Sequence, residues 1–226
     1  MYRDFSLDLD RSEYSLAAFK EQHKLSGYDR SGGIPLEILL EKFFAPEERS
    51  LSCSRCENAG AMACARSSLT VLPRVLVLHL KRFRCDPRTR SFTKMLTPVK
   101  FGRELVLPQT AVDPECEKPN KSGSKNLRKS PIELMNQWQV PSSDGSPLSP
   151  SNLATGPQRY ALSAVVRHFG STAFSGHYMC DIKSDVDGGK WTRCDDSSMY
   201  PVKEEEVFED KITPYILFFS LISIDH

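Results

Sequence analysis

The chain has 226 residues, which is enough for one large domain or two small ones. Hydrophobic residues make up 39% and charged residues 26%, close to the globular average, and this excludes a wholly disordered or collagen-like chain. The 30 lysines and arginines are balanced by 29 aspartates and glutamates, so the charge gives no sign of a nucleic-acid partner or of an anionic membrane surface.

Hydropathy and cysteine usage together indicate where in the cell the chain is expected. No apolar run approaches the roughly 18 residues that a membrane-spanning helix needs. Residues 1–10 alternate charged and apolar side chains and lack a hydrophobic signal core, so no secretory route is expected. The seven cysteines are an odd number, and two of them form Cys53-x-x-Cys56. This usage is typical of reduced thiols or a metal-binding pair, and it predicts the cytoplasm or the nucleus.

Two helical segments are expected near the N-terminus. Residues 15–24 are compatible with a helix, and residues 26–33 are rich in turn formers. Leucines and phenylalanines then recur at helical spacing in residues 36–44, between Pro35 at a first-turn position and Pro46. One side of this second helix should belong to the core.

Strand patterns follow the second helix. The segment 72–83 is a nearly continuous apolar run that ends in two cations, which is typical of a strand buried on both faces in the middle of a sheet. An exposed connection is expected at residues 85–93. Short strands are expected at residues 99–101 and 105–107.

The composition changes in the second half of the chain. Residues 109–158 are rich in Pro, Ser, Asn, Gly and Lys, which predicts a disordered insertion. Order is expected to resume with strands at residues 160–169, 176–183 and 191–194. A terminal apolar strand is expected at residues 214–224.

Three polar motifs stand close together in this last part: His168-Phe-Gly170, Ser175-Gly-His177-Tyr178 and Trp191-Thr-Arg-Cys-Asp195-Asp196. A turn centred near Val186 would place Asp195 opposite His177 on one sheet face, within hydrogen-bonding range. A carboxylate there would fix the imidazole tautomer and stabilise the imidazolium, as the third member of a catalytic triad does. The same pattern also fits a half-buried strand histidine beside a solvated Asp-Asp turn, so both interpretations stay open.

The chain resembles the C-terminal two thirds of the catalytic domain of a ubiquitin-specific protease. The similarity begins at residues 2–9 and ends at residues 215–218. It includes the family's LP-x-VL-x-LHLKRF stretch at residues 72–83, its histidine box at residues 160–178 and its closing element at residues 191–196. Several long motifs in the right order make this resemblance specific.

The resemblance implies an α+β, papain-like cysteine protease fold. Residues 1–226 would form the palm and fingers of that domain, an antiparallel sheet with flanking helices, and the thumb with the nucleophile would be missing. The implied function is deubiquitination, the thiol-dependent hydrolysis of the isopeptide bond at the C-terminal glycine of ubiquitin. The implied partners are ubiquitin and ubiquitinated proteins, with no nucleic acid and no membrane, and no cofactor is required.

The resemblance also assigns roles to residues. His177 is similar to the family's general base, Asp195 to its orienting acid and Asp196 to an adjacent supporting acid. The connection 85–90 and the loop 170–175 are similar to the two loops that cover the ubiquitin tail. The implied substrate-binding residues are Phe83, Gly170, Ser175, Gly176 and Tyr178.

The chain departs from the family pattern at its cysteines. None of the seven stands in the Gly-Asn-Thr-Cys box that holds the family's nucleophile, and Cys194 replaces the usual Phe before Asp195. Hydrolysis by this chain alone is therefore not expected, and an inactive ubiquitin-binding or regulatory fragment is the alternative. 

Metal binding and disulfide formation are the two other possibilities for the cysteines. Cys53 and Cys56 are similar to one half of the zinc ribbon in the family's fingers, and Cys64 follows eight residues later. Structural zinc needs four ligands, so reduced thiols are expected, with a structural zinc as the alternative. Cys180 and Cys194 lie on the two strands of the expected hairpin, where we expect packed thiols and not a disulfide.

Overall fold

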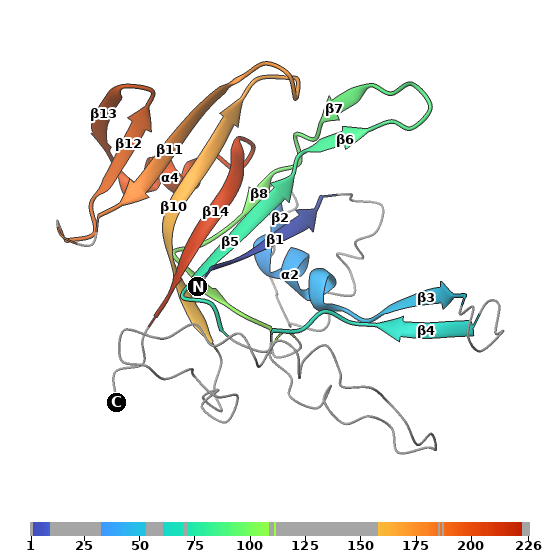
Figure 1. Ribbon diagram of the computed structural model, residues 1–226. Coiled ribbons are helices and arrows are strands. Elements are labelled where there is room, and N and C mark those ends of the chain that lie inside the picture. Colours follow the sequence, from blue (N-terminus) through green and yellow to red (C-terminus); the bar gives the residue numbers. More distant parts are fainter. Residues whose placement is uncertain are drawn as a thin grey trace.

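The computed structural model describes residues 2–9, 33–52, 61–69, 72–108, 111, 158–184, 186 and 188–222. The largest element within these residues is an eight-stranded sheet (Figure 1). Its strands are β1 (Tyr2–Asp8), β5 (Val75–Lys81), β9 (Glu104–Val106), β10 (Arg159–Phe169), β11 (His177–Lys183), β12 (Trp191–Asp195), β13 (Ser198–Val202) and β14 (Pro214–Leu221). The main path follows the order β1-β5-β14-β10-β11-β12-β13, and β9 pairs with β10.

The sheet is antiparallel except at one edge, where β1 and β5 run parallel. The predicted central place of segment 72–83 is confirmed, because β5 lies between β1 and β14. The predicted burial of this strand on both faces is wrong. Leu76, Leu78 and Leu80 are buried, whereas the residues that alternate with them are partly or fully exposed.

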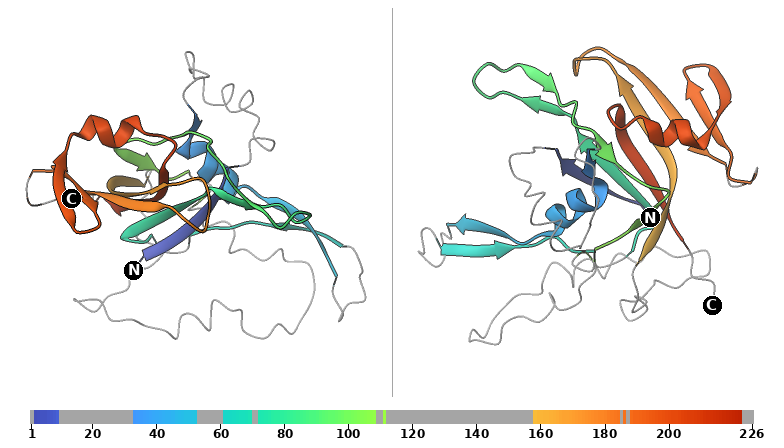
Figure 2. Two further views of the ribbon diagram at one scale, coloured as in Figure 1. Left: turned by 90° about the horizontal axis from the view of Figure 1, so that it is seen from above. Right: turned by 180° about the vertical axis from the view of Figure 1, so that it is seen from behind.

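Two helices cover one face of the sheet, α2 (Leu36–Phe44) and α4 (Glu204–Glu209) (Figure 2). The ring of Phe5 on β1 packs against Phe43 and Phe44 of α2, with centroids 4.9 and 5.3 Å apart. Trp191 on β12 packs against Phe208 of α4 at 6.3 Å. One cross-strand row joins these two regions and contains Phe5, Leu78, Leu217, Val165, Asp181 and Arg193. The expected α+β architecture is confirmed, and its helices leave the other face of the sheet less covered.

Proline sets both ends of α2, as the sequence predicts. The helix begins directly after Pro35 and buries Leu36, Leu39 and Phe44. It stops before Ala45, whose ψ of 145° is extended. A residue that precedes proline is disfavoured in the helical region, and Pro46 follows Ala45.

Smaller strand pairs extend from the sheet (Figure 1). They are β2 (Ile34–Pro35) with β8 (Val99–Lys100), β3 (Glu47–Leu51) with β4 (Ala61–Ala65), and β6 (Phe83–Cys85) with β7 (Phe92–Lys94). The predicted exposed connection at residues 85–93 corresponds to the tip of the β6–β7 hairpin.

Some sequence predictions fall on residues that the structure does not describe. These are the helix at residues 15–24, the pair Cys53 and Cys56, and residues 109–158 except Ala111 and Gln158. They stay predictions. In the described part of the chain, no helix is long and apolar enough to cross a membrane.

Arg82 follows β5 and is completely buried, whereas the neighbouring Lys81 is exposed. Its guanidinium donates hydrogen bonds to the carbonyl oxygens of Pro214 (2.6 Å), Thr97 (2.9 Å), Met95 (3.1 Å) and Lys211 (3.1 Å). Burial lowers the pKa of Arg82 to about 10, so the side chain stays charged at neutral pH. The Arg82 side chain therefore connects the end of β5 to the start of β14 and to the segment that follows β7.

Candidate active site

His177 and Asp195 form a hydrogen-bonded pair at one end of the large sheet. His177 is the first residue of β11 and Asp195 the last of β12. Nε2 of His177 lies 2.5 Å from Oδ1 of Asp195, and the two side chains are 46% and 33% exposed. The predicted proximity is confirmed. The role of the pair in catalysis stays a prediction.

The register of the hairpin differs from the predicted one. A turn centred on Val186 would place Cys180 opposite Thr192. In the structure Cys180 lies opposite Cys194, so the register is shifted by two residues. A shift of two keeps each side chain on its face of the sheet, and long side chains reach diagonal neighbours. His177 and Asp195 therefore meet diagonally and not directly across the hairpin.

The hydrogen bond selects one tautomer of the imidazole. A carboxylate can only accept, so Nε2 of His177 carries the proton and Nδ1 keeps a lone pair. Nδ1 is then able to take a proton from a nearby acid, while the Asp195 carboxylate stabilises the imidazolium that results.

Asp196 completes a cluster with this pair. It adopts a φ of 49°, in the left-handed region that Asp tolerates better than most residues. One ligand atom each of His177, Asp195 and Asp196 lie within 4.8 Å of one another. These donors suit a zinc ion chemically, but the hydrogen bond already occupies Nε2 and one carboxylate oxygen.

The loop before His177 closes tightly on itself through glycine. Gly170 has a φ of +142°, and a Cβ there would lie 2.9 Å from the Cα of Gly176 and from the carbonyl oxygen of Ser175. A Cβ on Gly176 would lie 2.1 Å from Nε2 of His168. The imidazole of His168 therefore fills the space beside Gly176.

Aromatic rings surround His168, which is 1% exposed. Its ring centroid lies 4.7 Å from Tyr178, 5.2 Å from Phe83 and 6.2 Å from Tyr215. Tyr178 is 49% exposed, so it forms the solvent-facing part of this cluster. The structure thus brings the predicted residues Phe83, Gly176 and Tyr178 together. Sequence reasoning missed the central His168 and Tyr215, although the His168-Phe-Gly170 motif was a signal for the former.

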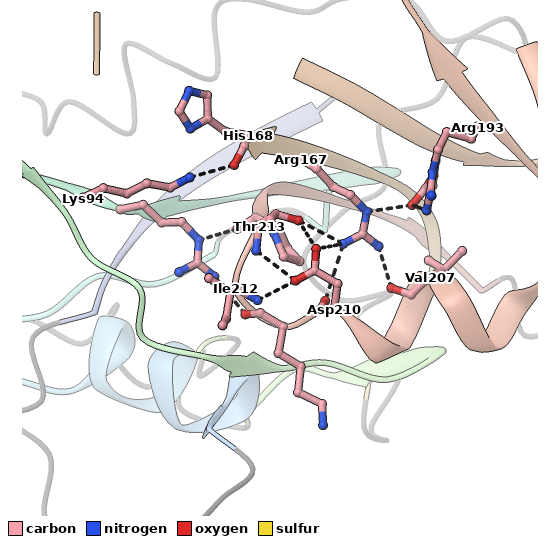
Figure 3. A network of polar contacts seen from close by, with 12 residues as sticks. Lys94, Arg167, His168, Arg193, Val207, Asp210, Ile212 and Thr213 are labelled. Atoms are coloured by element: carbon pink, nitrogen blue, oxygen red, sulfur yellow. Dashed lines mark hydrogen bonds and ion pairs between the residues drawn. The ribbon is translucent and has the colours of Figure 1, made fainter. Parts of the chain in front are cut away.

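Lys94 joins the two loops that the resemblance singles out. Its ammonium donates to the carbonyl oxygen of His168 at 2.7 Å (Figure 3). It also donates to the carbonyl oxygen of Gly170 at 2.8 Å. The rings of Phe92 and Phe174 also meet edge to face at 5.4 Å. The β6–β7 hairpin and the loop 170–176 are therefore in direct contact. No feature of the sequence distinguished Lys94 from other surface lysines.

The buried histidine makes stability depend on pH. Burial, and to a smaller extent the charge of Lys94, lowers the pKa of His168 below 6.5. The unfolded chain then binds more protons than the folded one as the pH falls below 6.5, so stability decreases on acidification. We expect the melting temperature to fall between about pH 7.5 and pH 6. In His168→Gln this fall should be smaller, and a wild-type melting temperature that rises on acidification would contradict the assignment.

The described cysteines lack the features of a nucleophile for His177. Cys180 and Cys194 are free thiols, as predicted. Along its strand, Cys180 is three residues from His177, and Cys194 is one residue from Asp195. Because side chains alternate along a strand, these thiols point to the opposite face. Burial, and less strongly Cys194 and Asp181, raises the pKa of the Cys180 thiol to about 11, which keeps it protonated. Cys64 and Cys85 lie on the outlying strands β4 and β6.

Comparison with known proteins gives consistent results. A model of the family described as ubiquitin carboxyl-terminal hydrolase matches residues 11–219. Human ubiquitin carboxyl-terminal hydrolase 31 is 33% identical over 181 residues, which are 79% of this chain and 12% of that protein. Human ubiquitin carboxyl-terminal hydrolase 27 is 28% identical over 229 residues, which are 99% of this chain and 45% of that protein. The chain thus spans less than half the length of these relatives.

Solved structures share the fold. Ubp8 in a SAGA deubiquitinating module bound to ubiquitin aldehyde superposes with a TM-score of 0.54 at 20% identity, over 98% of this chain and 36% of Ubp8. A second structure of the module, with monoubiquitin, gives a TM-score of 0.55 at 21% identity, over 98% of this chain and 36% of that one. The predicted papain-like fold is therefore confirmed.

Proposed function

Because the chain belongs to the ubiquitin carboxyl-terminal hydrolase family, we propose that it supplies the acid–base half of a deubiquitinase active site. The reaction is thiol-dependent hydrolysis of the isopeptide bond at the C-terminal glycine of ubiquitin, in ubiquitinated proteins. The observation that carries this proposal is the 2.5 Å contact between Nε2 of His177 and Oδ1 of Asp195.

The geometry gives each residue of the pair a task. Nδ1 of His177 takes the proton of a cysteine thiol, which becomes the nucleophilic thiolate. Asp195 accepts the Nε2 hydrogen bond throughout and stabilises the imidazolium. The imidazolium then returns the proton to the departing lysine amine. Asp196 adds a second carboxylate to the electrostatic surroundings of the imidazolium.

The nucleophile comes from outside these 226 residues. No cysteine of the sequence stands in the family's nucleophile box. Cys180, the cysteine nearest to His177 in sequence, points to the other face of the sheet and stays protonated at neutral pH. We therefore propose that a further segment or a second chain places its thiol beside Nδ1 of His177.

The tail of ubiquitin would pass along the surface formed by the two loops that Lys94 connects. Its diglycine end has no side chains, and it would run over the outer side of the loop that contains Gly170, Ser175 and Gly176, and over the exposed ring of Tyr178. Phe83 supports that ring through His168. The loop itself is closely packed at Gly170 and Gly176, and a diglycine end without side chains would suit a surface formed by such a loop.

A second candidate function is binding of ubiquitin without hydrolysis. It is favoured by the lack of the family's nucleophile box in the sequence, since the described loops and the aromatic cluster do not depend on a nucleophile. Neither function requires a cofactor. A structural zinc at Cys53 and Cys56 and a cytoplasmic or nuclear location stay predictions.

A ubiquitin probe with a C-terminal electrophile separates the two functions. We expect no covalent labelling of the chain alone, and labelling once it is joined to the nucleophile-bearing segment of a family relative. The control replaces the cysteine of that segment by serine, which should abolish labelling. Labelling of the chain alone would contradict the proposal that the nucleophile lies outside it. No labelling of a folded, ubiquitin-binding fusion protein would contradict the proposed catalysis. The second result would favour the binding function.

A further inference from the structure

We propose that Asp181 is a positioning residue, which holds the Asp195 carboxylate against His177 through Arg193. The inference rests on the proposed function, because it concerns the same pair. Its physical basis is a buried network of ion pairs, which lies at the end of the β11–β12 pairing that is nearest to His177 and Asp195.

Asp181 is completely buried and receives hydrogen bonds from two arginines. Arg193 on β12 donates from Nε to Oδ1 at 2.6 Å and from Nη2 to Oδ2 at 3.1 Å. Arg167 on β10 donates from Nε to Oδ2 at 2.8 Å. The Asp181 carboxylate thus links β10 and β12, the two strands that flank β11. A buried carboxylate without such partners would be strongly destabilising, so the three side chains fix one another.

The other end of Arg167 is anchored outside the sheet (Figure 3). Its Nη2 donates to the carbonyl oxygen of Val207 in α4 at 2.6 Å, and its Nη1 to Oδ2 of Asp210 at 3.2 Å. Two arginines are thereby balanced by two aspartates. The network ties β10, β11 and β12 to α4 and to the segment before β14, which gives Asp181 a rigid support.

This network lies next to the His177–Asp195 pair on the same sheet face. Asp181 stands directly opposite Arg193, and Arg193 is two residues before Asp195. The pairing of β11 with β12 ends at Cys180 and Cys194, so Asp195 is beyond the last paired position and pairs only with Ser198 of β13. Arg193 makes two hydrogen bonds to Asp181 close to this point. This contact thus holds the end of β12, which carries Asp195, against β11.

The inference predicts a spectroscopic effect at His177. In the 226-residue chain with ¹⁵N-labelled histidine, the imidazole shifts of His177 should show the Nε2–H tautomer with its hydrogen bond. His177→Gln identifies the signal, and Asp195→Ala supplies the reference without the carboxylate. In Asp181→Asn and in Arg193→Met the signal should move toward this reference, with a mixture of tautomers.

A matched control is available at the far end of the network. Asp210→Asn removes a partner of Arg167 without touching β12, so it should lower the melting temperature but leave the His177 signal in place. Arg193→Met is the safer variant for folding, because Arg193 is 17% exposed. Unchanged His177 signals in folded Arg193→Met, or an equal change in Asp210→Asn, would overturn the inference. Because these signals report a hydrogen bond and not turnover, they stand even if the proposed hydrolysis fails.

Discussion

We expect His177→Ala to lower the hydrolysis of a ubiquitin C-terminal amide by about 10²- to 10⁴-fold, the usual contribution of general acid–base catalysis. The measurement uses the chain joined to a nucleophile-bearing segment of a family relative. Without the imidazole no group accepts the thiol proton or protonates the departing amine, so kcat should fall while ubiquitin affinity is retained. Asp195→Ala should also lower kcat, because the imidazole loses its preferred tautomer.

A second histidine provides the control. His79 lies on β5, where its Nδ1 is 3.1 Å from Oγ of Ser6, outside the His177–Asp195 pair. His79→Ala should keep most of the activity. If His177→Ala keeps its activity too, then His177 is not the base, and the geometry of the pair has another purpose.

We expect Arg82→Met to destabilise the fold by about 2–5 kcal/mol, because each buried carbonyl oxygen that loses its donor costs about 1–3 kcal/mol. Arg82 is completely buried, and the substitution deprives the carbonyl oxygens of Pro214, Thr97, Met95 and Lys211 of their donor. Buried carbonyl groups without a partner carry the full cost of desolvation. Denaturant unfolding of the wild-type and variant chains measures the difference.

An exposed arginine serves as the comparison for Arg82. Arg103 forms a salt bridge with Glu204 at 2.6 Å, but its side chain is 68% exposed. Arg103→Met should cost about 0–1 kcal/mol, as surface ion pairs do. Equal effects of the two substitutions would show that the Arg82 contacts do not hold the sheet together.

Local sequence patterns predicted the helix and the hairpin whose ends are set by residues close to them in the sequence. Pro35 and Pro46 bound α2, and the spacing of its apolar residues placed its buried side. The hairpin of β11 and β12 was also predicted, but its register was wrong by two residues. Both Gly188 and Gly189 adopt positive φ values, of 67° and 79°. A run of turn-forming residues shows that a turn is present, but not which of them occupies its centre.

The charged residues of the interior could not be predicted from local patterns. Arg82, Arg167 and Asp181 look like solvent-exposed residues in the sequence, and their partners are far along the chain. Only tertiary contacts reveal that each is paired. The same reason explains why Lys94 was missed, since its two acceptors belong to His168 and Gly170.

The position of β14 has a consequence for the order of events during synthesis. This strand is the last of the described chain, yet it lies at the centre of the sheet between β5 and β10. Until the ribosome releases it, the unit β10 to β13 and the pair β1 and β5 each present an unpaired strand with an apolar side. Such edges invite aggregation. The nascent chain should therefore need protection by chaperones until β14 emerges and joins the two halves.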